Sequence, residues 1–331
     1  MKYSFLFVIC ALFLWVGCDK EDDIKVSEGL EVSYALPQGN HDYDEDIMVW
    51  YDKYGFYTLY IYENKDIYWS NTEWDERFEE YGKDGGGSLK AKMADEDYVG
   101  EQLEMFEYSF LSVYPDSLIT HYMPLKVLSC SELWSTRWNA YYDWTIGEMV
   151  RKLVYDTIWA YEGWDYIAIN GAGSEMNTRD MDSQMRFSYE LNTIFIKRLY
   201  KTGKIEMTEE FTSVSDYSVN EHLTGPIVFT RGFLADNPLG HSSVINRQKA
   251  VFEEYLNLVG MPLGMLEGTP DTRYDWGYDE ETGYPMKMSI VGALHETRDV
   301  NGLVRKKYEA VIKILKELGV DTDRLQKGYI E

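Results

Sequence analysis

The fold of this chain is decided by the stretch YIAINGAG at residues 166–173. Its first four side chains are apolar and the glycines close it, which predicts a short strand. A helical pattern follows from about Arg179 to Tyr200, where Phe187, Leu191 and Phe195 recur at three-to-four-residue spacing. The stretch therefore predicts a strand followed by a long helix.

Outside this unit the chain contains more helical patterns than strand patterns. Helices are predicted over Asp95–Val113, Ser243–Val259 and Leu303–Leu318. Lys126–Ser129 is a short strand candidate, and Ile47–Tyr68 is strand-like in pieces. Because no regular alternation of strand and helix is present, the predicted fold class is α+β, rich in helix with a small mixed sheet.

The N-terminus has the composition of a lipoprotein signal. Lys2 precedes an apolar run at residues 3–16, and Gly17 and Cys18 follow it. These are the parts of a secretory signal, and the run is too short for a relaxed membrane span. A cysteine after a small residue resembles the lipobox of bacterial lipoproteins, in which the thiol is acylated. The stretch Lys20–Asp23 resembles the lysine-then-acid export tag of surface lipoproteins in Bacteroidota.

We therefore expect three segments in the chain. Residues 1–17 are a lipoprotein signal peptide, residues 18–30 are an acylated tether with Cys18 as the lipidation site, and residues 31–331 are a single domain with an insertion at about 266–302. Palmitate-type acyl chains would anchor the protein in the outer membrane, at the cell surface. A plain signal peptide with an incidental cysteine is the alternative.

Composition excludes some function classes. The formal net charge is -25, from 32 basic and 57 acidic residues, so binding to nucleic acid or to a membrane through a basic helix is disfavoured. The 28 Tyr and 10 Trp suit both cores and sugar-stacking surfaces, and we assign the dense stretch at residues 50–74 to the core. Once Cys10 is cleaved off and Cys18 is acylated, only Cys130 remains, which excludes an intramolecular disulfide. We expect Cys130 to be a small buried residue.

The histidines do not form a helical zinc site. Such a site needs two histidines at i and i+4, so that both rings reach one ion, and a Glu to polarise the bound water. No two of the five histidines have this spacing. The nearest approach is His295-Glu296, with Asp299 where the second histidine would stand. His222 and His241 are expected in surface loops.

The sequence also does not define a serine-nucleophile site or a catalytic pair of carboxylates. The chain has no Gly-x-Ser-x-Gly nucleophile elbow. Glu209-Glu210 and Glu253-Glu254 are the carboxylate pairs in the best-structured places, but with 57 acidic residues a glycosidase pair cannot be assigned by spacing. A solvated helix face is the default interpretation of both pairs.

The order of several segments resembles the zinc-binding metallopeptidase lipoproteins of Bacteroidota, which often occur alongside outer-membrane glycan-uptake systems. The segments are Tyr114–Asp116, Tyr166–Ile169, Glu209–Val214, Arg231–Leu234, Phe252–Tyr255 and Ile314–Leu325. The resemblance covers about residues 47–330 and implies a zincin-like α+β domain. The family is gluzincin-like, with a His-Glu-x-x-His-x-x-His helix after the strand and a later glutamate in a Phe-x-Glu setting.

Carried over to this chain, the resemblance implies a degenerate metal motif. Tyr189, Thr193 and Ile196 stand where the three histidines belong, Glu190 stands where the general base belongs, and Glu254 where the later glutamate belongs. The tyrosine phenol is protonated at neutral pH and isoleucine has no donor atom. Without an ion, the retained glutamate has no metal-bound water to activate. The resemblance thus implies no metal, no cofactor and no catalytic residue.

These observations predict a surface-exposed, non-catalytic lipoprotein that captures glycan or peptide nutrients, attached to the membrane by its lipid anchor and working beside an outer-membrane uptake complex. No nucleic acid partner is expected. The alternative is an active hydrolase, either a zinc-dependent peptidase or a carboxylate-based enzyme, with its site at His295 and Glu296 or at a carboxylate pair. A purely structural role in an envelope complex is a third possibility.

Overall fold

The structure is a computed structural model that describes residues 34–68, 89–174, 180–219, 222–235, 238–241, 243–270 and 290–328. The chain divides into two compact units, Met1–Leu36 and Pro37–Glu331. The predicted signal peptide and Cys18 lie outside the described residues, as does the middle of the predicted insertion at 266–302.

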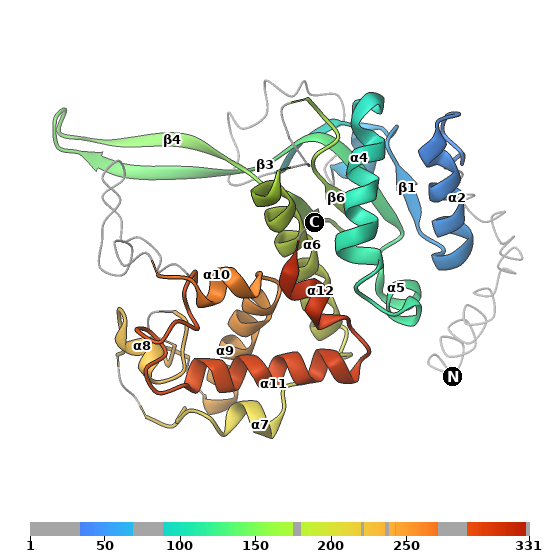
Figure 1. The fold of residues 1–331 in the computed structure, drawn as a ribbon. Helices are drawn as coiled ribbons and strands as arrows, with labels where there is room; N and C mark the ends of the chain where they lie inside the picture. Colours follow the sequence, from blue (N-terminus) through green and yellow to red (C-terminus); the bar gives the residue numbers. More distant parts are fainter. Residues whose placement is uncertain are drawn as a thin grey trace, which may run out of the picture. The chain divides into compact units, whose positions relative to one another are not determined.

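A mixed sheet in the second unit is organised around one long strand, β3 (Lys126–Asp143), which pairs with four others. β1 and β6 run parallel to β3, whereas β2 and β4 run antiparallel to it, and β5 adds to β6 in antiparallel fashion (Figure 1). These strands are β1 (Tyr57–Leu59), β2 (Leu89–Met93), β4 (Glu148–Thr157), β5 (Ala160–Glu162) and β6 (Tyr166–Ile169).

The predicted strand at residues 166–170 is confirmed as β6. All four of its side chains are buried, because it lies between two other strands of the sheet. After it comes α6 (Met181–Lys201), which confirms the long helix predicted from Arg179 to Tyr200. Asp180 caps α6 by accepting a hydrogen bond from the Ser183 N–H at 2.9 Å.

The strand-like interpretation of residues 47–68 is wrong for its first part. A helix, α2 (Asp42–Tyr54), covers that part, and only β1 is a strand. Ile47, Trp50 and Tyr54 are spaced three and four residues apart and are buried together, so the dense aromatic residues follow a helical period. The helix ends at Gly55, whose φ of 83° is a left-handed conformation that glycine adopts readily. A short helix, α3 (Asn64–Ile67), follows β1.

The helix predicted over Asp95–Val113 is confirmed in two parts. The first is α4 (Glu96–Phe106) and the second is η3, a π-helical turn (Glu107–Leu111). Phe106 and Phe110 stack in the core with ring centroids 5.3 Å apart. α5 (Asp116–Tyr122) begins just after Pro115.

The C-terminal half of the unit is helical. The helices predicted over Ser243–Val259 and Leu303–Leu318 are confirmed as α9 and α11. α11 buries one stripe of side chains, formed by Val304, Tyr308, Val311, Ile312 and Leu315. The helices of this half are α7 (Glu209–Thr212), α8 (Ile227–Thr230), α9 (Val244–Val259), α10 (Leu263–Glu267), α11 (Leu303–Glu317) and α12 (Thr322–Lys327).

The strand predicted at Lys126–Ser129 is much longer than expected. β3 continues to Asp143 and pairs with β4 from Trp134 opposite Thr157 to Asp143 opposite Glu148. From Thr136 onward, β4 is its only partner strand among the described residues. The two strands form a ribbon that projects from the rest of the unit (Figure 1). Most β4 side chains are exposed on both faces, so the alternation that marks a half-buried strand is absent from its sequence.

The described residues thus combine many helices with a mixed sheet, which agrees with the predicted mixture of helices and strands. Cys130 is fully buried, as predicted, and burial raises the pKa of its thiol to about 12. Within the described part of the chain, no helix has both the length and the apolar character needed to cross a membrane.

Candidate functional site

The helix predicted to carry the metal motif is α6, and its motif positions are used for packing. Ile196 is fully buried, and Thr193 is nearly so. A Cβ at Gly260 would lie only 2.5 Å from the Thr193 Oγ1, so the end of α9 approaches α6 closely at this point. Thr193 and Ile196 therefore lie in the contact between α6 and its neighbours.

Glu190 on α6 is a structural acceptor. Its Oε2 accepts hydrogen bonds from the backbone N–H groups of Trp159, at 2.5 Å, and Ala160, at 3.4 Å. Burial raises the pKa of Glu190, while these two hydrogen bonds and the charge of Arg186 act in the opposite direction. The carboxylate thus fixes the start of β5 onto α6. Burial also raises the pKa of the Tyr189 phenol, which keeps it protonated at neutral pH.

Glu254 lies on α9, in a different environment from Glu190. Among the described residues, no hydrogen bond or ion pair joins the two glutamates. The charge that acts on Glu254 is that of Lys307, on α11. Burial raises the pKa of Glu254 to about 7, and the Lys307 ammonium partly offsets this. The Glu254 Oε2 is buried and has no hydrogen-bond partner among the described residues.

Lys307 is fully buried in a cage of aromatic rings. Its Nζ donates a hydrogen bond to the Gly232 carbonyl oxygen at 2.8 Å and lies 4.6 to 5.6 Å from four ring centroids. Burial lowers the pKa of Lys307 to about 7, and the Glu254 charge acts against this. The ring faces attract the ammonium and so hold α11 against α7 and α9. The rings belong to Phe211, Tyr217, Phe233 and Tyr255.

Sequence reasoning missed Lys307 because the run Arg305-Lys306-Lys307 resembles a solvated helix face. One signal could have found it. Lys307 is three residues after Val304 and four before Val311, so it falls on the buried stripe of α11.

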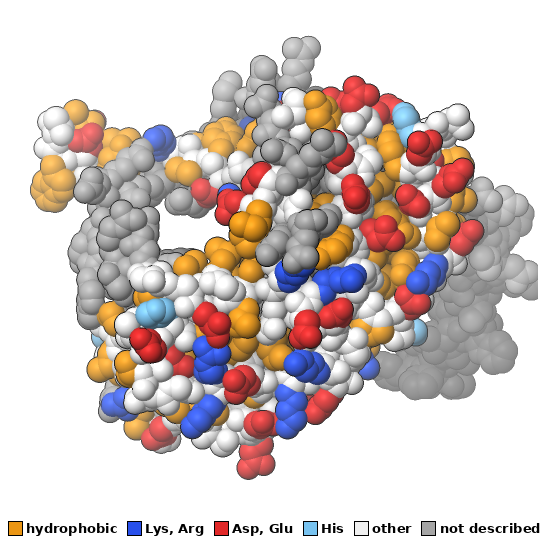
Figure 2. Space-filling view, in the orientation of Figure 1, with side chains coloured by type: hydrophobic (Ala, Val, Ile, Leu, Met, Phe, Trp, Pro, Cys, Tyr) orange, Lys and Arg blue, Asp and Glu red, His pale blue; other side chains and the backbone are white. Residues whose placement is uncertain are grey.

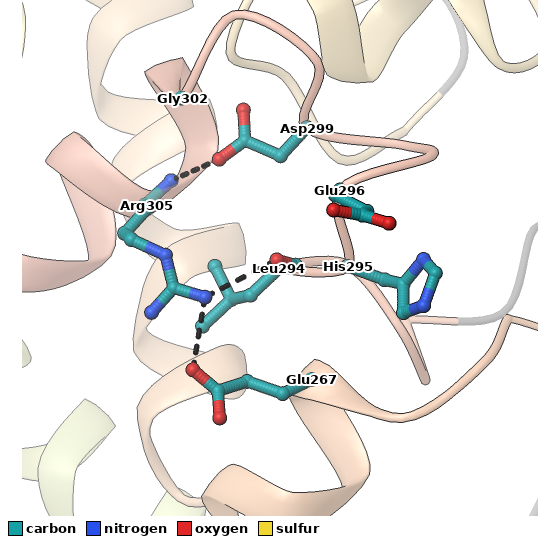
Figure 3. A pocket seen from close by; sticks show the side chains of 7 residues that line it. All are labelled: Glu267, Leu294, His295, Glu296, Asp299, Gly302 and Arg305. Carbon is teal, nitrogen blue, oxygen red and sulfur yellow. Dashed lines mark hydrogen bonds and ion pairs between the residues drawn. The ribbon is translucent and has the colours of Figure 1, made fainter.

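His295 and Glu296 line a hollow of about 370 Å³ (Figure 3). The His295 Nδ1 lies 2.9 Å from the Thr297 Oγ1 and accepts a hydrogen bond from the Thr297 N–H at 3.3 Å. The imidazole of His295 lies on the opposite side of the hollow from Arg305 and Glu267, and it points away from both (Figure 3). The full lining is Glu267, Leu294, His295, Glu296, Asp299, Gly302 and Arg305.

Asp299, which stands where a second metal-binding histidine would be, caps α11 instead. Its Oδ1 accepts a hydrogen bond from the Val304 N–H at 3.0 Å. Its Oδ2 accepts one from the Arg305 N–H at 2.8 Å (Figure 3). The surrounding segment consists of turns. Both carboxylate oxygens are therefore occupied by the start of a helix.

Arg305 separates this hollow from a second one. Its Nη2 lies 2.9 Å from the Glu267 Oε1 and donates to the Leu294 carbonyl oxygen at 3.2 Å. The second hollow has a volume of about 330 Å³, and its lining is Leu263, Arg305, Tyr308, Glu309, Ile312, Lys313, Lys316 and Gln326. We call the pair the Arg305 hollows. They lie at the junction of α10, α11 and α12.

The remaining predicted residues lie on the surface. Glu210 pairs with Lys313 at 2.7 Å, and both side chains are more than half exposed, which confirms a solvated face for Glu209-Glu210. His222 and His241 are exposed in loops, as predicted.

Metal ligands do not come together in the part of the chain that the structure describes. It contains no group of three or more His, Cys, Asp or Glu side chains that could hold an ion. No protein family, curated protein or solved structure matches this chain.

Proposed function

We propose that this protein is a lipid-anchored lipoprotein of the outer-membrane surface that captures peptides or glycans without catalysis, on a zincin-like scaffold with a degenerate metal motif. The observation that carries the proposal is the pair of Arg305 hollows, which offers two adjoining recesses with different chemistry. An uptake complex in the same membrane would receive the captured ligand.

The chemistry of the second hollow indicates the kind of ligand. Tyr308 and Ile312 form an apolar wall. Three cations, Arg305, Lys313 and Lys316, outnumber the one carboxylate in the lining, Glu309. Arg305 and Lys313 also pair with Glu267 and Glu210 outside it, so Lys316 is the cation of this lining without an ion pair among the described residues. Figure 2 shows basic side chains among acidic ones over α11. Since the chain as a whole has a net charge of -25, such a cationic recess favours an anionic group on an apolar body, such as a peptide carboxylate or an acidic sugar.

The position of Glu190 supports capture over hydrolysis. A general base must be free to take a proton from the attacking water. Here one carboxylate oxygen faces two backbone N–H groups, and neighbouring motif positions pack into the core. The residue therefore serves the structure of the scaffold.

A binding experiment tests the proposal. Acidic peptides and uronate-containing oligosaccharides are titrated into the purified protein by calorimetry. The double substitution Lys313→Glu and Lys316→Glu should weaken binding about tenfold or more, since it reverses two charges at the recess. The matched control, Lys306→Glu with Lys249→Glu, reverses two exposed charges elsewhere and should change the affinity less than twofold. The proposal fails if neither ligand class binds.

The alternative function is hydrolysis at the first hollow, favoured by the placement of His295 and Glu296 in its wall. Metal analysis and a chelator test separate the two functions. The capture proposal expects no stoichiometric zinc and an unchanged melting temperature after chelation, because the fold gains nothing from metal binding. Stoichiometric zinc, together with peptide hydrolysis that disappears in His295→Ala, would establish the hydrolase instead.

A further inference from the structure

The end of the β3–β4 ribbon displays apolar side chains to solvent. Trp144 is 87% exposed, Ile146 and Met149 are each 60% exposed, and Tyr142 is 42% exposed. Figure 2 shows hydrophobic side chains gathered at the free end of the ribbon. We call these four residues the ribbon tip. A contiguous apolar group at the end of a projecting arm is typical of a contact surface.

The turn that carries the ribbon tip is held in one conformation. The Gly147 N–H donates to the Asp143 carbonyl oxygen at 2.8 Å, with Gly147 at a φ of 73°. The Thr145 N–H donates to the Asp143 Oδ1 at 2.8 Å, and the Tyr142 hydroxyl donates to the Gly147 carbonyl oxygen at 2.8 Å. Trp144 packs edge-on against Tyr142, with ring centroids 4.7 Å apart. Binding therefore requires little further ordering of the turn.

The charged side chains near the tip of the ribbon follow a sequence of acidic residues at the turn and basic residues behind it. The Asp143 carboxylate is engaged by the turn itself. Glu148 pairs opposite Asp143, so both lie on the face away from Tyr142 and Met149, which are themselves paired. Arg151 and Lys152 are exposed two and three residues behind Met149, at roughly 7 to 10 Å along the strand. An apolar tip is thus followed by two cations.

We propose that the ribbon tip is a second membrane contact that inserts into the surface of a zwitterionic bilayer. Tryptophan and tyrosine favour the interface between headgroups and acyl chains, and cations behind them reach the depth of the phosphates. The net charge of -25 disfavours an anionic surface. This inference rests on the proposed lipid anchor, because the acyl chains on Cys18 would keep the protein beside the bilayer that the ribbon tip contacts.

The length of chain before the described residues permits this contact. Tyr34, the first of these residues, is 16 residues after Cys18, so a fully extended tether spans at most about 55 Å. The ribbon extends for roughly 30 Å from Trp134 to Asp143.

The experiment uses the full-length acylated protein reconstituted in phosphatidylcholine bilayers. Thr145→Cys is labelled with an environment-sensitive fluorophore, since the native Cys130 is buried and Cys18 is acylated. Spin-labelled lipids should quench the label at position 145 at least threefold more strongly than a label at Lys306→Cys, an exposed site on α11. Adding Trp144→Ser and Ile146→Ser should remove this difference. The matched control, Val49→Ser with Val300→Ser, alters valines that are 59% and 60% exposed elsewhere and should preserve it.

Equal quenching at positions 145 and 306 would overturn the inference. So would unchanged quenching in the Trp144→Ser and Ile146→Ser variant. Loss of binding by that variant to a protein or glycan, with no lipid quenching at position 145, would assign the ribbon tip to that partner and overturn the membrane contact. Failure of the lipid anchor is separate, because it appears as an unacylated Cys18 by mass spectrometry. Failure of ligand capture appears only in the calorimetry on the Arg305 hollows.

Discussion

At the scale of single residues, three ionisable side chains are engaged in hydrogen bonds and packing. Glu190 accepts two backbone N–H groups, Asp299 caps a helix, and Lys307 is enclosed by aromatic rings. Each of these groups has a structural effect that substitution can measure.

The first prediction concerns Glu190. Because burial raises its pKa, its contribution to stability is full below the unfolded pKa and is lost as the pH rises through the folded pKa. At pH 7, Glu190→Gln should therefore be neutral or stabilising by about 1 kcal/mol, since the amide oxygen still accepts the Trp159 N–H. Glu190→Ala leaves both N–H groups without this acceptor and should cost about 1 to 3 kcal/mol.

Urea denaturation at pH 5 and pH 7 measures both variants, and the advantage of Gln should shrink at the lower pH. A wild-type hydrolytic activity that disappears in Glu190→Gln would instead make this residue catalytic and contradict the capture proposal.

The second prediction concerns Glu254 and Lys307. Between about pH 4.5 and 7 the folded Glu254 holds a proton that the unfolded chain has lost, so its contribution to stability falls as the pH rises. Between about pH 7 and 10.5 the unfolded Lys307 holds a proton that the folded form releases, so its contribution grows as the pH rises. The contribution of the pair should therefore be lowest near pH 7.

Lys307→Met should remove the rise above pH 7, and Glu254→Gln should remove the fall below it. Each should change the free energy of unfolding across its full window by on the order of 3 to 5 kcal/mol. Thermal and urea unfolding from pH 4.5 to 9.5 provide the measurement. Tyr217, Tyr255 and Asp299 are the other titratable groups that act within this cluster.

The control is Glu253→Gln, at an exposed position beside Glu254. If both test variants leave the pH profile of stability unaltered, Glu254 and Lys307 are not the groups that cause it.

At the scale of elements, the close approach of α9 to α6 depends on a residue without a side chain. A Cβ at Gly260 would lie 2.5 Å from the Thr193 Oγ1 and 3.1 Å from the Tyr189 carbonyl oxygen. The φ of Gly260 is -74°, which any residue adopts, so only the space is limiting. The third prediction follows from this geometry.

Gly260→Ala should destabilise the protein by about 1 to 3 kcal/mol, because the added methyl group pushes the two helices apart. Gly264→Ala serves as the matched control: a Cβ at Gly264 would have no other atom within 4 Å, so this substitution should be neutral or slightly stabilising in α10. Denaturation midpoints of the two variants measure the difference. Equal midpoints would show that α9 does not depend on this approach.

At the scale of the whole molecule, attachment to the membrane should depend on one residue. The fourth prediction is that Cys18→Ala leaves the protein unacylated and shifts it from the membrane fraction to the soluble extracytoplasmic fraction, because the acyl chains supply most of the membrane affinity. Fractionation with acyl labelling is the measurement. Ser88→Ala, which changes a hydroxyl residue far along the chain from the lipobox, is the control. Membrane retention of an unlabelled Cys18→Ala protein would mean that another contact dominates.

Local patterns in the sequence determined α6, α9, α11 and β6, since each buries a stripe or run whose period is set by neighbouring residues alone. The burial of Cys130 followed in the same way. The tertiary structure alone decided the ribbon, because β4 is exposed and is held by pairing with β3 rather than by an apolar pattern of its own. It also decided the roles of Glu190 and Glu254, whose partners Trp159 and Lys307 lie 31 and 53 residues away. A carboxylate takes its function from the groups that folding brings beside it, and its own sequence neighbours do not specify them.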